Sequence, residues 1–461
     1  MKKQYIITYI LLLCLLISAC NKFLDVAPKG KTTLNTVNDF DLWLGSQTLS
    51  EISGIPQICW MTDHAQKIPW RPEIIAEAER AYTWSEQLTD ADAPPKMLSG
   101  AYNHIYYFNT VLENIDAVTG DAQRKQQLKA EALLGRANEY FYLINLYGKP
   151  YDAATAATDL AVPFVVSSDI NTATPPRATV QELYNHMIED LNTAIINLPA
   201  TNAGNRFRGS VHAAYSVLAR IYLYQRNYAE AARYAEMSLQ RPGGAAVTDY
   251  NGVLKNVFPR TTELNEMIYA RGSDPTSGTI ISIADSAFIK SYPSTDLRLA
   301  LTFYNGVASA FNYNTVNPSA GVRFSATANG YYDVEVGTTV AEMKLIIAEN
   351  AARTNDLTGA LRQLNEIRIN RFAPANYRAL ASGNQNEVFQ WVIRERRFEM
   401  PMNGMRWFDM RRLDSEGLMP AVVRIDQSKN VIATLAPKSP RYTLQIPLNA
   451  IVFNPGMPNN P

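Results

Sequence analysis

Amphipathic helical faces recur along most of this chain of 461 residues, and they constrain its fold more than any other feature. Between 129 and 147, Leu133, Ala137 and Tyr140 step by four and three, which places them on one face of a helix. Comparable faces follow at 179–198, 211–222, 228–239 and 339–367. Because each face must be covered by a neighbour, we expect a mostly α protein whose helices pack side by side.

The segment 211–240 shows the spacing of a known helical repeat. The positions that match the tetratricopeptide pattern are Tyr215, Leu218, Ala219, Tyr222 and Ala231. Small residues in that pattern let two antiparallel helices approach, while aromatic residues fill the groove between them. Such hairpins stack into a continuous core. We expect this scaffold over about 97–240 and again over 339–412, with a few short strands elsewhere.

The first twenty residues predict export and a lipid anchor. Two lysines precede an apolar run from Tyr5 to Ile17, which is too short to span a bilayer comfortably and ends in small residues. Its end reads Ile-Ser-Ala-Cys and is similar to the lipobox of bacterial lipoproteins, whose cysteine is acylated and becomes the new N-terminus. We therefore expect a signal peptide over 1–19 and one mature domain over 20–461, anchored by acyl chains on Cys20. An ordinary secretory signal is the alternative.

Charge and side-chain chemistry argue against several classes of function. The chain carries 43 basic and 43 acidic residues, so it lacks the excess of Lys and Arg that nucleic-acid binding requires. The histidines at 64, 104, 186 and 212 share no ligand-like spacing, so we expect no metal site. Cys59 is the thiol that remains once Cys14 and Cys20 are assigned to the leader and the lipid, and we expect it to be a small buried hydrophobe.

Two stretches interrupt the helical pattern with Gly, Pro and many aromatic residues. They cover about 40–95 and 245–335. Long ordered loops are uncommon in a compact domain unless they carry function. We therefore expect loop-rich insertions that contribute to a binding site.

An arginine-rich segment over 392–412 is the densest group of charges in the C-terminal third. On a helix, Asp409 lies one turn from both Arg406 and Arg412, so its carboxylate can bridge two guanidinium groups. Glu395 and Glu399 lie four residues apart among arginines. We expect them to be permanently ionised partners of arginine and not a catalytic pair, since a catalytic acid needs a raised pKa.

The same segment resembles the signature of the SusD/RagB family of Bacteroidetes outer-membrane lipoproteins. It reads Val-Ile-Arg-Glu-Arg-Arg-Phe-Glu over 392–399 and Asn-Gly-Met-Arg-Trp-Phe-Asp-Met-Arg-Arg over 403–412. Other segments agree with the family in order: 23–28, 265–270, 292–298, 444–447 and 454–456. The resemblance covers essentially the whole chain.

The resemblance implies a surface receptor that caps a SusC-type TonB-dependent transporter in the outer membrane, facing outward. Members deliver an oligosaccharide or, in some relatives, a peptide. Sugar rings stack on aromatic faces while polar side chains bind their hydroxyl groups. The ligand-binding candidates are therefore aromatic residues of the two loop-rich regions: Trp60, Trp70, Trp84, Tyr292, Tyr304, Tyr313 and Tyr331.

Two other functions stay open on the sequence. An anchored assembly protein would use the helical repeats only to hold other outer-membrane proteins together. A surface glycoside hydrolase would need two carboxyl groups roughly 5 to 9.5 Å apart in a cleft, which no spacing here suggests. We expect a binding protein without catalytic residues or cofactor.

Overall fold

Helices form most of the regular structure in the computed structural model, which describes residues 34–66, 76–251, 265–273, 283–305, 309–310, 322–324, 336–426 and 428–461. The helices are α2 (Val37–Leu44), α3 (Ile55–Met61), α4 (Ala76–Tyr82), α5 (Lys96–Asn114), α6 (Ala122–Tyr147), α7 (Val180–Ile195), α8 (Val211–Tyr224), α9 (Tyr228–Leu239), α10 (Ser286–Ser291), α11 (Leu297–Thr302), α12 (Val340–Arg353), α13 (Leu357–Arg368), α14 (Gln385–Glu399), α15 (Met405–Ser415) and α16 (Leu448–Phe453). Short 3-10 turns are η1 (Gln47–Ser50), η2 (Ile115–Ala117) and η5 (Pro440–Tyr442). The mostly α prediction is confirmed.

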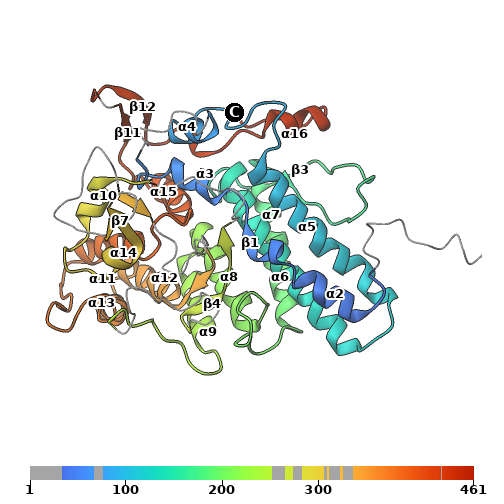
Figure 1. Cartoon of the computed structure of the whole chain (residues 1–461), viewed down its shortest axis with the longest axis horizontal. Helices are drawn as coiled ribbons and strands as arrows, with labels where there is room; N and C mark the ends of the chain where they lie inside the picture. Colours follow the sequence, from blue (N-terminus) through green and yellow to red (C-terminus); the bar gives the residue numbers. More distant parts are fainter. Residues whose placement is uncertain are drawn as a thin grey trace, which may run out of the picture.

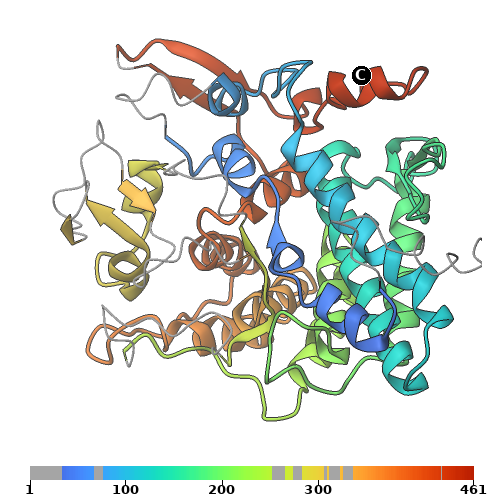
Figure 2. The same ribbon diagram turned by 45° about the vertical axis from the view of Figure 1, so that its right-hand side comes forward.

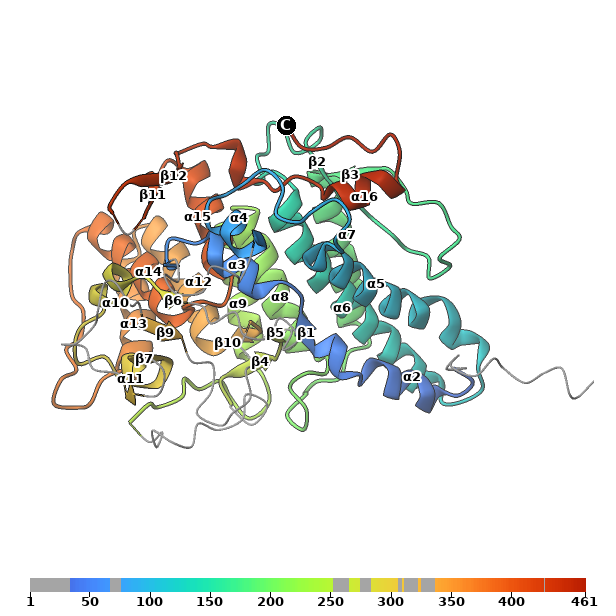
Figure 3. The same ribbon diagram turned by 45° about the horizontal axis from the view of Figure 1, so that its top comes forward.

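The long helices follow one another across the molecule as an array (Figures 1 and 3). Consecutive helices from α5 to α9 pack against each other, and α12 packs on α9 before α13 and α14 extend the array. The two predicted scaffold segments therefore join directly, although about a hundred residues separate them in sequence. Stacking covers each apolar face, as expected for helical repeats.

The α8–α9 hairpin shows why this sequence forms a close helical pair. Ala219, Ala231 and Ala235 are fully buried between the helices, so their small side chains allow the close approach. The side chain of Asn227 caps α9 by accepting the backbone N–H of Glu230.

At the starts of both α7 and α12, a threonine and a glutamate lie three residues apart, the spacing of a capping box. The box of Thr179 and Glu182 is present in both directions. At α12, Thr339 accepts the N–H of Glu342 at 3.0 Å, but the Glu342 carboxylate binds Arg220 instead of returning to the cap. A buried ion pair outweighs the reciprocal cap bond here because it satisfies a whole charge.

Strands are short, as predicted, and lie mainly between the helical segments. They are β1 (Glu51–Ile52), β2 (Leu160–Pro163), β3 (Arg177–Thr179), β4 (Met267–Tyr269), β5 (Gly272–Ser273), β6 (Ile283–Ala284), β7 (Phe303–Asn305), β8 (Ser309–Ala310), β9 (Val322–Phe324), β10 (Thr338–Thr339), β11 (Val422–Ile425) and β12 (Val431–Leu435). In the described parts of the chain, two-stranded sheets pair β1 with β5, β4 with β10, β2 with β3 and β11 with β12, and a further sheet has the order β6-β9-β7-β8. Figure 2 shows the strands between 283 and 324, with α10 and α11, to one side of the helical array.

The region 40–95 is more helical than the sequence indicates. It contains most of α2 and all of α3 and α4, and α3 packs on both α4 and α15. These helices have seven or eight residues each, so tertiary packing rather than a long periodic face specifies them. Within the described residues, no helix combines the length and hydrophobicity of a membrane span.

Candidate functional site

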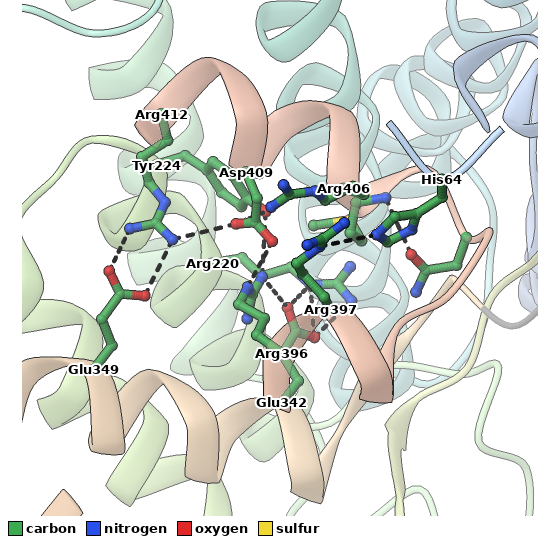
Figure 4. Close-up of polar contacts among 12 residues, drawn as sticks. His64, Arg220, Tyr224, Glu342, Glu349, Arg396, Arg397, Arg406, Asp409 and Arg412 are labelled. Atoms are coloured by element: carbon green, nitrogen blue, oxygen red, sulfur yellow. Dashed lines mark hydrogen bonds and ion pairs between the residues drawn. The ribbon is translucent and has the colours of Figure 1, made fainter. Parts of the chain in front are cut away.

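The arginine-rich signature lies on α14 and α15 and forms a buried network of charges (Figure 4). Asp409 accepts a hydrogen bond from Arg396 Nε at 2.8 Å and from Arg412 Nη2 at 3.3 Å. Arg412 also donates to both carboxylate oxygens of Glu349 on α12, at 2.5 and 3.1 Å. Arg396 reaches Glu342, in the first turn of α12, at 3.4 Å. The network therefore ties α12, α14 and α15 together.

Arg406 does not share Asp409 with Arg412 as the spacing predicts. Its Nε and Nη2 donate instead to the two carboxylate oxygens of Asp63, at 2.8 and 2.7 Å. A bidentate ion pair with Asp63, which follows α3, has a better hydrogen-bonding geometry than a contact with Asp409 on the same helix. Arg397 adds a further bond to Asp63 at 3.2 Å, so the signature also fastens the N-terminal segment to the C-terminal third.

Glu395 and Glu399 on α14 are ion-pair partners of arginine, as predicted. Glu395 lies 2.7 Å from Arg298 and 3.1 Å from Arg368. Glu399 lies 2.5 Å from Arg298 and 2.8 Å from Arg371. Burial, the largest single influence, raises the pKa of Glu399, but Arg371 and Arg298 together hold that pKa below its usual value. A carboxylate that stays ionised is unsuited to act as a general acid.

Buried His64 contacts the charge network through Arg397. Its ring stacks on Phe288 with centroids 3.8 Å apart, and its Nε2 accepts a hydrogen bond from Arg397 Nε at 3.3 Å. Burial is the largest influence on the pKa of His64 and holds it well below the usual range; Arg397 and Arg406 act in the same direction, against Asp63. His64 is therefore neutral in the folded protein at neutral pH.

We expect the free energy of unfolding to fall more steeply with acidification in the wild type than in a His64→Gln variant. Because the folded pKa of His64 lies below the unfolded value of about 6.5, its contribution is fully present above that pH and is lost as the pH falls through and below it. Urea denaturation at a series of values from about pH 7.5 to 5 measures the difference in slope, at most about 1.4 kcal/mol per pH unit. Parallel profiles for the two proteins would contradict the expectation.

Three of the predicted aromatic ligand contacts are core residues. Trp60, Trp84 and Tyr292 are buried in the main hydrophobic cluster. Trp84 Nε1 donates to the carbonyl of Met61 at 2.8 Å, and Tyr292 stacks on Phe398 with centroids 4.0 Å apart. Their burial favours a packing role over ligand contact, and ligand contact by these three residues stays an untested prediction.

The structure does not describe the side chains of the other predicted site residues. Tyr304 lies in β7, where the backbone alone is described. Trp70, Tyr313, Tyr331 and the lipid-anchor candidate Cys20 lie outside the described residues. They stay predictions.

A cavity of about 250 Å³ lies where η1, the loop before α8 and strand β4 meet. Its lining residues are Leu44, Gly45, Ser46, Gln47, Leu49, Ser50, Phe108, Glu131, Asn205, Phe207, Arg208, Gly209, Tyr269 and Arg271. The wall combines apolar and aromatic side chains with hydroxyl, amide and charged groups. That combination suits a polar ligand with an apolar face, such as a sugar ring.

One side of the cavity carries a balanced group of charges. Arg208 donates to both carboxylate oxygens of Glu131, from Nε at 2.6 Å and from Nη2 at 3.1 Å. Its Nη1 lies 2.8 Å from Asp41, which is also 2.8 Å from Arg124. The two guanidinium groups and two carboxylates neutralise each other.

Cys59 and the histidines show no reactive or metal-binding arrangement. Cys59 is buried, its Sγ donates to the carbonyl of Met402 at 2.8 Å, and burial raises the pKa of its thiol to about 12. This confirms the expected buried hydrophobe. Among the described residues, no group of His, Cys, Asp and Glu side chains has the arrangement of a metal site.

Comparison with known proteins places this fold in a class of outer-membrane-associated binding proteins. The SusD-like family described as "Starch-binding associating with outer membrane" matches residues 22–223, and the SusD family matches residues 339–461. Together the two matches span well over half the chain. The chain belongs to the SusD/RagB family.

Solved structures share the fold over nearly the whole length. A putative sugar-binding protein from Bacteroides vulgatus is 22% identical, with a TM-score of 0.72 and coverage of 94% of this chain and 99% of that one. A SusD superfamily protein from Bacteroides thetaiotaomicron is 20% identical, with a TM-score of 0.71 and coverage of 92% and 100%. Surface glycan-binding protein A from Bacteroides uniformis is 17% identical, with a TM-score of 0.71 and coverage of 92% and 99%. No curated protein matches the chain.

Proposed function

We propose that this chain is a cell-surface lipoprotein, anchored through Cys20, that binds a glycan and delivers it to a SusC-type TonB-dependent transporter. The observation that carries the proposal is the cavity beside η1, which places Phe207 among serine, glutamine, asparagine and arginine side chains. Membership of the SusD/RagB family and structural likeness to proteins named for sugar and glycan binding support it. Trp70, Tyr304, Tyr313 and Tyr331 stay candidates for further ligand contacts.

No covalent step belongs to this function. The paired carboxylates of the arginine-rich signature are held in ion pairs, and the cavity needs only to bind and release its ligand. Peptide binding is the alternative that the family resemblance leaves open.

Calorimetry on the mature chain, with Cys20→Ser to prevent acylation, tests the proposal against a panel of neutral oligosaccharides, acidic oligosaccharides and peptides. We expect saturable binding of one glycan class, with the ligand recovered intact in product analysis. Phe207→Ala should weaken that binding roughly tenfold, since loss of an aromatic stacking face costs about 1 kcal/mol or more. Phe389→Ala is the matched control, because Phe389 is also half-buried but lies on α14, away from the cavity.

Turnover of the glycan would contradict a binding function. Binding confined to peptides would replace the glycan with the alternative ligand, and no binding across the panel would favour an assembly role. Co-purification of the lipidated chain with a large β-barrel transporter tests the partner separately.

A further inference from the structure

Arg271 brings to the cavity a positive charge that lies over the Tyr269 ring, 3.8 Å from its centroid, but has no carboxylate partner among the described residues. It directly precedes β5, which pairs with β1 near the middle of the molecule in Figure 3, and its side chain is 5% exposed. Within the described parts of the chain, no carboxylate lies at ion-pair distance from its guanidinium group. A buried charge without a counter-charge destabilises a protein unless hydrogen bonds or an opposite charge stabilise it.

The contacts of Arg271 leave part of the guanidinium group available. Nη1 donates to the carbonyls of Phe207 and Ala270, at 2.9 and 2.7 Å, and Nη2 contacts the hydroxyl of Tyr269. Nε has no acceptor among the described residues, yet it is not one of the fully enclosed polar atoms. Its N–H is therefore open to the cavity that Arg271 lines.

Arg424 and Arg177, two other buried arginines without carboxylate partners, differ from Arg271 in this respect. Arg424 donates from Nε, Nη1 and Nη2 to four backbone carbonyls, and Arg177 also donates from all three nitrogens. Neither lines the cavity. They act as clamps on the backbone, whereas Arg271 retains a donor that faces open space.

Neighbouring carboxylates are already engaged. Glu139 faces His104 at 3.3 Å, Glu51 accepts from Gln47 at 3.2 Å, and Glu131 is held by Arg208. Among the residues that line the cavity, Arg271 is thus the cation that has no carboxylate partner.

We propose that the bound glycan carries a carboxylate and that Arg271 binds this group. The inference rests on the proposed glycan-binding function and names its ligand class as acidic sugars, such as uronic acids. Arg208 and Arg220 both hold carboxylates in this chain through Nε and Nη2, the edge that contains the free Nε of Arg271. A planar carboxylate fits that edge of the guanidinium group and neutralises its buried positive charge.

The test compares binding of tri-galacturonate and its methyl ester to the mature chain by calorimetry. The two ligands have the same rings and differ in charge. We expect tri-galacturonate to bind at least roughly tenfold more tightly, as a charge-assisted hydrogen bond contributes about 1.5 kcal/mol or more. Because this comparison uses the wild-type chain, it does not depend on whether a variant folds.

Variants then assign the effect to Arg271. Arg271→Gln should remove the preference for the charged ligand, so that this variant binds tri-galacturonate and its methyl ester with equal affinity. Arg362→Gln removes the same charge from an exposed position on α13 and should keep the preference. Equal affinity of the wild type for both ligands, or a preference that survives in Arg271→Gln, would overturn this inference while leaving glycan binding intact. If neither these ligands nor any other oligosaccharide binds, the proposed function itself fails.

Discussion

Replacing Arg220 with Met is expected to lower the free energy of unfolding by about 3–5 kcal/mol, because it leaves a buried carboxylate without its main partner. Arg220 on α8 and Glu342 on α12 are each 1% exposed. Nε donates to both carboxylate oxygens, at 2.9 and 3.0 Å, and Nη2 to one of them at 2.7 Å. Nη1 also donates to the carbonyl of Val336 and Nη2 to that of Gly337, so the substitution removes a donor from two backbone carbonyls, of which Val336 keeps the hydrogen bond from Tyr142.

Urea denaturation followed by circular dichroism measures this loss. Arg233→Met is the matched control, since Arg233 forms an exposed ion pair with Glu230 on α9 and its loss should cost at most about 1 kcal/mol. The double variant Arg220→Met with Glu342→Leu should recover part of the loss, because it removes both buried charges. A loss for Arg220→Met no larger than that of the control would show that the buried pair contributes little.

The helical scaffold could be predicted from sequence because its signal is local. The apolar faces of α6, α7, α8 and α9 repeat at helical spacing, and the Thr179–Glu182 capping box marks the start of α7. The stacking of α12 on α9 could also be expected, because each helical repeat has a second apolar face that a neighbouring helix must cover.

The sequence predicted that the arginines of the signature form ion pairs with carboxylates, but it did not predict every partner. Spacing along a helix shows that Asp409 can reach Arg412, which it does at 3.3 Å. It cannot show that Arg406 faces Asp63, which lies more than three hundred residues earlier in the chain. Long-range partners depend on the packing of α15 against α3, and no local pattern records that contact.

The candidate site was largely beyond the reach of sequence reasoning. Aromatic composition identifies side chains that suit sugar binding, but it does not say whether a ring faces the core, as Trp60 and Tyr292 do. The cavity combines Gln47, Phe207 and Arg271 from three distant segments, none of which carries a motif. The unusual feature of Arg271, a buried cation without a carboxylate partner among the described residues, depends on the folded structure and leaves no pattern in the sequence.

Phe408→Ala is expected to lower the free energy of unfolding by about 3–5 kcal/mol, through the lost apolar contacts and the cavity that the substitution leaves. Phe408, in the middle of the signature helix α15, is 0% exposed. Its ring packs against Phe141, Tyr142 and Tyr224, with centroid distances of 5.9, 5.8 and 6.0 Å. These partners belong to α6 and α8, so one side chain joins the signature to the helical scaffold.

Phe453→Ala is the matched control, because the same side chain on α16 is 76% exposed and its removal should change the free energy of unfolding by only about 0.5 kcal/mol. Phe408→Leu should give an intermediate loss, since it keeps most of the buried volume but forfeits the ring contacts. If Phe408→Ala lost no more than Phe453→Ala, the ring contacts of Phe408 would contribute little to holding α15 on the scaffold. The expected large loss instead shows that aromatic packing, and not only the ion pairs of the arginines, holds the signature helix on α6 and α8.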